Sequence, residues 1–109
     1  MTNVELFKQI TTEMANTYEA KNSDYGNSFE NTLTKYGHNI GLARIDDKLS
    51  RINQLLNNHT AKVNDESIED TLKDLATYSI MLLMFLKKTA PPDTTFDSFN
   101  ATTTYVGNK

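Results

Sequence analysis

The stretch NDESIEDTLKDLATYSIMLLMFL, residues 64–86, passes from acidic residues to an almost purely apolar run. Asn64 or Asp65 can cap the free backbone N–H groups at the start of a helix, and the acids that follow suit the positive end of the helix dipole. Lys88 suits the negative end, and the proline pair at 91–92 prevents the helix from continuing. The stretch therefore predicts one long helix from Asn64 or Asp65 to about Lys88.

The second half of this helix, residues 78–86, is apolar on every side, and on one side its acidic residues give way to Met81 and Met84. A helix that is apolar all round is normally covered all round. Three helices of the expected length cannot wrap it completely, so we expect a second subunit to complete the cover. The protein is therefore predicted to be a homo-oligomer.

Hydrophobic periodicity predicts the rest of the fold. Apolar residues recur every three or four positions over residues 3–20 and 40–57, which predicts two more helices. A short helix is expected over residues 28–36, and residues 91–109 show no helical period. The length suits one small domain, residues 1–90. We expect an all-α fold, a small bundle of three main helices and one short helix, with an irregular C-terminal tail.

Composition argues against several classes of partner. With a net charge of −3 and a pI of about 5.2, the chain lacks the diffuse basic surface that binds duplex DNA or RNA. Its apolar run is about half the ~20 residues that a membrane-spanning helix requires. The chain has no cysteine, and its start lacks the basic and apolar regions of a signal peptide. We expect no duplex nucleic acid, no membrane insertion and a cytoplasmic location.

Acidic side chains form a stripe along the start of the helix that follows residue 64. Glu66, Asp70 and Asp74 are spaced four residues apart, so they lie on one face. Taken alone, this stripe is a solvated face. At the mouth of a groove, repelling carboxylates are most easily explained by a divalent cation such as Mg²⁺ between them. The pattern allows Mg²⁺ but requires no cofactor.

A row of mixed charge lies on the helix expected over residues 40–57. Arg44, Asp47, Lys48 and Arg51 share the side opposite its apolar stripe. Arginine side chains in this arrangement suit bidentate contacts with phosphate oxygens. The same residues could instead form a salt-bridge ladder with the acidic stripe. Spacing leaves both interpretations open.

The stretch KNSDYGNSF is typical of a turn, because Asn, Ser, Asp and Gly satisfy backbone groups locally. It contains a donor, an amide, a carboxylate, a ring and a flexible backbone position at Lys21, Asn22, Asp24, Tyr25 and Gly26. Such a set could bind a base or ribose, or could be an ordinary polar turn with its tyrosine in the core.

Three stretches in this order, KNSDYGNSF, RIDDKLSRINQLL and ESIEDTLKDLATYSIMLL, resemble the nucleotide modification associated domain 1 family over residues 21–86. That family is common in phages and is similar to the all-α, MazG-like nucleoside triphosphate pyrophosphohydrolases, whose sites form between helices and often between subunits. The resemblance implies a site for a free nucleotide. The matching residues are Lys21, Asn22, Asp24, Tyr25, Gly26, Arg44, Asp47, Lys48, Arg51, Glu66, Asp70, Asp74 and Tyr78.

The chain departs from the catalytic relatives in its acids. Those enzymes share an E-x-x-E pair and an E-x-x-D pair, whose four carboxylates hold magnesium. Here Ser67 replaces the first acid of the second pair, and the first pair is reduced to Asp47 beside Lys48. Because metal-dependent hydrolysis needs carboxylates to hold the ion and activate water, the departure favours a binder over a hydrolase.

The resemblance thus implies a phage-type protein that holds a phosphorylated nucleotide in a charged groove between helices or subunits. It would act in modified-nucleotide metabolism, or would sequester a nucleotide signal of host defence, in the host cytoplasm. One alternative is a Mg²⁺-dependent nucleoside triphosphate pyrophosphohydrolase, with the metal on Glu66, Asp70 and Asp74. A further alternative is a non-catalytic helical adaptor or oligomerisation module.

Overall fold

A computed structural model of the chain describes residues 1–25, 27–57 and 67–90, with Asp24 and Tyr25 described by their backbone alone. This part of the chain is all-α and contains no strand. Its four helices are α1 (Asn3–Tyr25), α2 (Ser28–Tyr36), α3 (Asn39–Asn57) and α4 (Ile68–Thr89). The predicted set of three main helices and one short helix is confirmed.

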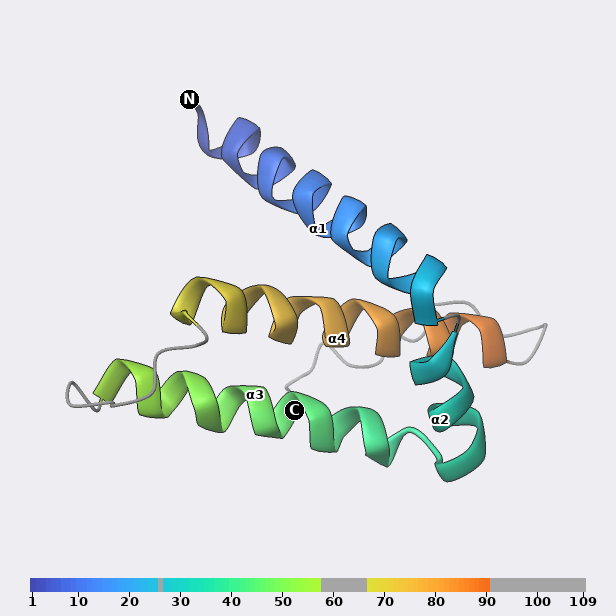
Figure 1. The fold of residues 1–109 in the computed structure, drawn as a ribbon. Coiled ribbons are helices and arrows are strands. Elements are labelled where there is room, and N and C mark those ends of the chain that lie inside the picture. The colour runs from blue at the N-terminus through green and yellow to red at the C-terminus, as the bar shows by residue number, and fades with distance from the viewer. Residues whose placement is uncertain (26, 58–66, 91–109) are drawn as a thin grey trace, which may run out of the picture.

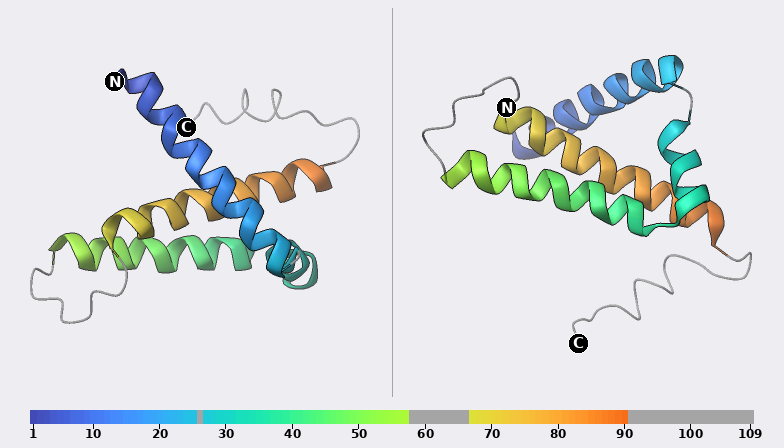
Figure 2. Two further views of the ribbon diagram at one scale, coloured as in Figure 1. Left: turned by 45° about the horizontal axis from the view of Figure 1, so that its top comes forward. Right: turned by 60° about the horizontal axis from the view of Figure 1, so that its bottom comes forward.

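Helices α3 and α4 run antiparallel, side by side, and form the most extensive contact between elements (Figure 1). Helix α2 lies across one end of this pair. Helix α1 crosses α4 on the side of α4 that faces away from α3 (Figure 2). The expected tail, residues 91–109, lies outside the described residues. In the described part of the chain, no helix has the length and apolar character needed to cross a membrane.

Helix α1 extends further than the sequence predicts. A reciprocal capping box starts it, since the Thr2 backbone N–H donates to Glu5 Oε1 at 2.7 Å and the Glu5 N–H donates to Thr2 Oγ1 at 3.0 Å. The turn expected from Lys21 onward is wrong up to Tyr25, where α1 ends. Asn22 lies one turn after Tyr18, and both are half-buried on the side toward α4. Helix α1 therefore continues through a polar segment whose residues have weak helix propensity.

Helix α4 begins later than expected. Ser67 is its N-cap, and the Ser67 Oγ accepts a hydrogen bond of 3.0 Å from the backbone N–H of Asp70. The predicted start at Asn64 or Asp65 is therefore wrong, and both residues lie outside the described part of the chain. Serine competes equally well for the cap position, which spacing alone cannot resolve. The end of the helix is as predicted to within one residue.

The buried core is small and lies along the contact between α3 and α4, with α2 packed against one end of it. Leu33 and Ile52, 1% and 7% exposed, are the buried hydrophobic residues of the described part of the chain. Thr71 is fully buried, and its hydroxyl donates to the Ser67 carbonyl at 2.9 Å. Gly41 allows close approach, because a Cβ there would lie 3.0 Å from Leu82 Cδ1. The contact between α3 and α4 therefore depends on a few tightly packed positions.

Truncating the core leucine tests this description. Leu33→Ala should lower the free energy of unfolding by ~2–5 kcal/mol, because it removes buried methyl groups and leaves a cavity. Leu6→Ala is the matched control, since Leu6 is 47% exposed on α1, and should change stability by less than ~0.5 kcal/mol. Urea denaturation followed by circular dichroism measures both. Equal effects of the two variants would show that Leu33 is not in the core.

Candidate functional site

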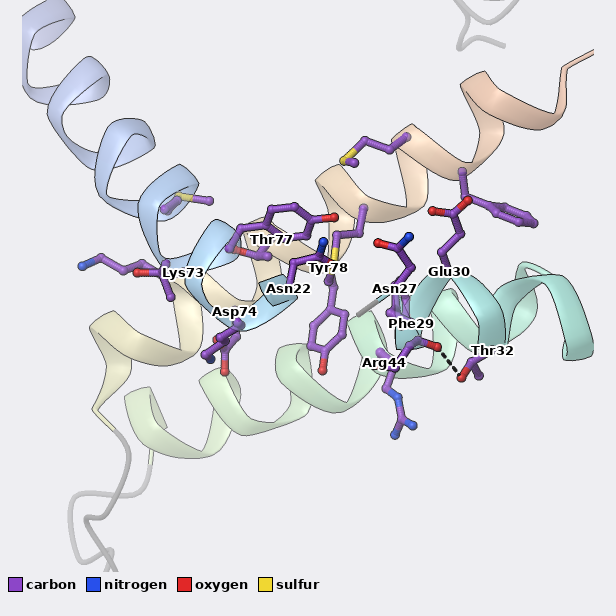
Figure 3. A pocket seen from close by; sticks show the side chains of 18 of the residues that line it. Asn22, Asn27, Phe29, Glu30, Thr32, Arg44, Lys73, Asp74, Thr77 and Tyr78 are labelled. Atoms are coloured by element: carbon purple, nitrogen blue, oxygen red, sulfur yellow. Dashed lines mark hydrogen bonds between the residues drawn. The ribbon is translucent and has the colours of Figure 1, made fainter. Parts of the chain in front are cut away.

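The last turns of α1, the start of α2 and the middle of α4 enclose a pocket of about 390 Å³ (Figure 3). This volume is within the usual range of ~300–1,000 Å³ for small-molecule sites. The pocket has an apolar floor and a polar mouth. We call it the aromatic pocket.

The floor of the aromatic pocket consists of rings and thioethers. Phe29 from α2 and Tyr78 from α4 meet edge to face, with ring centroids 5.1 Å apart and an interplanar angle of 63°. The other apolar lining residues are Met14, Tyr18, Met81, Met84 and Phe85. Methionine side chains adapt their shape to a ligand. This side of the apolar half of α4 therefore faces the chain's own α1 and α2.

The mouth of the aromatic pocket carries two amides. Asn22 belongs to α1 and Asn27 precedes α2. Asn27 is at the N-cap position of α2, yet its side chain makes no capping hydrogen bond. An amide offers both donors and an acceptor, so these two side chains can bind the edge of a planar polar group. Asn27 was not predicted, because an asparagine before a helix is usually explained as a cap.

A second, smaller pocket of about 250 Å³ adjoins the first. We call it the cationic pocket, because three of its lining residues, Arg44, Lys48 and Arg51, are basic. They lie on one side of α3 at intervals of four and three residues. Asp47 and Tyr78 complete the lining, and Arg44 and Tyr78 line the aromatic pocket as well. The two pockets therefore share two lining residues and lie next to each other.

The structure brings most of the predicted site residues into these two pockets. The aromatic pocket includes Lys21, Asn22, Arg44, Asp74 and Tyr78, and the cationic pocket includes Arg44, Asp47, Lys48, Arg51 and Tyr78. Asp70 is exposed and lines neither pocket. Gly26 and Glu66 lie outside the described residues, as do the side chains of Asp24 and Tyr25.

The carboxylate of Asp74 is engaged by a lysine. Lys48 Nζ lies 3.1 Å from Asp74 Oδ2, and the two side chains are 24% and 40% exposed. A pair this exposed contributes ~0–1 kcal/mol. It provides one rung of the salt-bridge ladder considered from the sequence. Within residues 1–25, 27–57 and 67–90, no three His, Cys, Asp or Glu side chains gather closely enough to hold a metal ion.

Ion pairs connect the helices that form the walls of the aromatic pocket. Lys73 Nζ lies 3.1 Å from Glu69 Oε2 on its own helix and 3.5 Å from Glu13 Oε1 on α1. The hydrogen bond to Glu69, together with the charge of both carboxylates, raises the pKa of Lys73 above its usual value. At the other end, Lys88 Nζ lies 3.0 Å from Glu30 Oε1 and connects α4 to α2. The sequence could not indicate these pairs, because they depend on how the helices cross.

The fold is a small all-α domain, and its two adjoining pockets form its candidate ligand site. Residues 21–86 match the model of the family described as Nucleotide modification associated domain 1. The chain belongs to this family. Comparisons with curated proteins and with solved structures found no match. The matched segment includes α2, α3 and most of α4, whereas Met14 and Tyr18 of the pocket floor precede it.

The raised pKa of Lys73 predicts how the α1–α4 connection depends on pH. Because the pKa of Lys73 is raised in the folded state, its ion pairs stabilise the fold fully below the unfolded pKa of 10.5. This stabilisation is lost as the pH rises through the folded pKa. Lys73→Gln should therefore be less stable than the wild type at pH 8, and the difference should shrink above pH 10.5. Urea denaturation at both pH values measures it. Lys8→Gln is the control, and a constant deficit in Lys73→Gln would show that the ion pairs do not cause it.

Proposed function

We propose that the protein binds a phosphorylated nucleotide, with the nucleoside in the aromatic pocket and the phosphate in the cationic pocket. The observation that carries this proposal is that the two pockets adjoin at Arg44 and Tyr78. A nucleotide likewise joins a flat, partly apolar group to an anionic group. The family description, which concerns nucleotide modification, supports the same class of ligand.

The aromatic pocket suits a nucleoside because rings and amides lie together there. Tyr18, Phe29 and Tyr78 offer surfaces on which a base can pack, and every base has a flat face. Asn22 and Asn27 supply donors and acceptors at the mouth for the polar edge of the base or the ribose hydroxyls. Methionines in the floor allow the pocket to accept bases of more than one shape.

The cationic pocket suits a small phosphate group. Two arginines and a lysine line it, and arginine can bind phosphate oxygens through two parallel hydrogen bonds. Asp47 lines the same pocket and Asp74 pairs with Lys48, so two carboxylates offset part of this positive charge. The small volume of this pocket, about 250 Å³, favours one phosphate, as in a nucleoside monophosphate or a cyclic nucleotide, over a triphosphate. The proposal needs no metal ion.

Two residues in the acidic stretch at the start of α4 have other roles in the structure. Ser67 caps α4 and Asp74 pairs with Lys48, so their geometry favours binding over Mg²⁺-dependent hydrolysis. A binder of this kind would serve modified-nucleotide metabolism, or would sequester a nucleotide signal of host defence if a phage encodes it.

Replacing single basic side chains tests the assignment of the cationic pocket to the phosphate. A thermal-shift screen with nucleoside mono-, di- and triphosphates and cyclic dinucleotides, with and without Mg²⁺, identifies the best ligand, since saturation at 100 times the dissociation constant adds ~2.7 kcal/mol of stability. Arg44→Ala and Arg51→Ala should each weaken its binding by ~1.5–3 kcal/mol in calorimetry, the usual value of a charge-assisted hydrogen bond. Lys8→Ala, an exposed change on α1, should leave the affinity unchanged.

Three results would contradict this proposal. If none of these nucleotides stabilises the protein, the adaptor interpretation gains. If Lys8→Ala weakens binding as much as Arg44→Ala, the attraction comes from overall charge and no specific site exists. If Mg²⁺ promotes rapid release of pyrophosphate from a nucleoside triphosphate, and Asp74→Asn abolishes that release, the protein is a hydrolase.

The side-chain amide of Asn27, which makes no capping hydrogen bond, gives a test of the nucleoside assignment. Asn27→Ala should change the free energy of unfolding by less than ~0.5 kcal/mol, because no capping bond is lost. It should nevertheless weaken nucleotide binding by ~0.5–1.5 kcal/mol, as expected for one hydrogen bond. Ser67→Ala is the opposite case, since it should cost ~1 kcal/mol of stability and leave the affinity unchanged. Denaturation and calorimetry on both variants measure the contrast, and a stability loss in Asn27→Ala without loss of affinity would assign Asn27 a purely structural role.

A further inference from the structure

Helices α3 and α4 both carry the seven-residue repeat that is typical of helical bundles. In such a repeat, two apolar positions per seven residues face the core. In α3 the first position is occupied by Leu42, Leu49 and Leu56, and the second by Ile45 and Ile52. In α4 the first is occupied by Leu72, Ser79 and Leu86, and the second by Leu75 and Leu82.

The chain covers the second position of each repeat more completely than the first. Ile52 is buried, and Leu82 lies against Gly41 of α3. By contrast, Leu42, Leu49 and Leu56 are 51%, 54% and 59% exposed, and Leu72 and Leu86 are 49% and 38% exposed. The first position of each repeat is therefore largely uncovered within one chain.

The exposed leucines of the two helices lie on the same side of the α3–α4 pair. On α3 the basic residues flank the Ile52 row on one side and the leucines flank it on the other. On α4, Asp74 and Tyr78 flank the Leu75 row on one side and Leu72 flanks it on the other. Since Asp74 pairs with Lys48 and Tyr78 lines a pocket with Arg44, the polar sides face the same way. The leucine rows consequently form one continuous surface, the leucine face, opposite the cationic pocket.

We propose that a second copy of this chain packs its own leucine face on this one, so that two α3–α4 pairs form a four-helix bundle. In such a bundle both apolar positions of each repeat face the core. The leucine face of the partner would cover the first position of each repeat, which is exposed in a single chain. Helices of 19 and 22 residues are about 28 and 33 Å long. Two of them side by side present a projected area of about 600 Å², which is of the order needed for a stable interface of ~800 Å² of accessible surface per partner.

The interface leaves the ligand site accessible, because both pockets open on other sides of α3 and α4. Ala76 and Ser79, two small residues near the leucines of α4, permit close approach of the partner helices. The inference is independent of the proposed nucleotide. The exposed residues Val4 and Phe7 of α1 share a seven-residue repeat with Met14 and Tyr18, which line the aromatic pocket. We therefore assign the interface to α3 and α4, whose exposed leucines line neither pocket.

Sedimentation equilibrium at micromolar concentration tests the proposal. The wild type should have about twice the mass of the 12.3 kDa chain, and Leu49→Lys should reduce it to the mass of one chain. The lysine should not unfold the chain, since Leu49 is 54% exposed within it, and circular dichroism checks this. Leu6→Lys is the matched control, because Leu6 is 47% exposed on α1, and it should remain dimeric.

Leu49→Ala keeps the test decisive if the lysine variant fails to fold, because alanine is the best helix former. It should raise the dimer dissociation constant about tenfold, as expected for truncation of a central interface residue, whereas Leu6→Ala should leave it unchanged. A wild type that remains monomeric overturns the proposal. So does a dimer whose dissociation constant is unaffected by Leu49→Ala, or one that only the Leu6 variants dissociate.

Discussion

The close approach of α3 and α4 is the contact on which the rest of the structure depends. Gly41 makes it possible, since any side chain there would meet Leu82 and Leu33. The contact sets the two helices at a distance at which Lys48 reaches Asp74 across their polar side. It also orients the leucines of both helices toward the opposite side. The contact between the two helices thereby separates the charged surface of the proposed ligand site from the apolar surface of the proposed interface.

The change from acidic to apolar along α4 follows from its different neighbours. Its first turns border solvent and the basic side of α3, where Asp74 finds a lysine. Further along, Met81 and Met84 lie under α1 and α2 and form the floor of the aromatic pocket. Helix α1 contacts the described part of the chain chiefly through α4, and ion pairs as exposed as that of Lys73 are weak. The α1 wall of the pocket is therefore the part that can move most easily.

The sequence predicts the helices well because apolar periodicity is a property of each helix alone. It predicts the row from Arg44 to Arg51 for the same reason, since one face of one helix carries it. Periodicity cannot show which helix lies opposite, so the roles of Lys73 and Tyr18 became visible only in the fold. The segment after Lys21 was predicted as a turn because its Asn, Ser and Asp residues favour turns locally, and no local signal shows that α1 continues to Tyr25.

The Lys48–Asp74 pair can serve both the unliganded protein and the proposed complex. Without ligand it neutralises a lysine that would otherwise repel Arg44 and Arg51, which line the same pocket. A phosphate entering that pocket would supply two or more oxygen acceptors in place of one carboxylate oxygen. Because the pair is partly exposed, breaking it costs little, and the lysine can turn to the phosphate without moving the backbone. The same residues that look like a structural salt bridge in the sequence are therefore compatible with a binding site, and the two interpretations need not exclude each other.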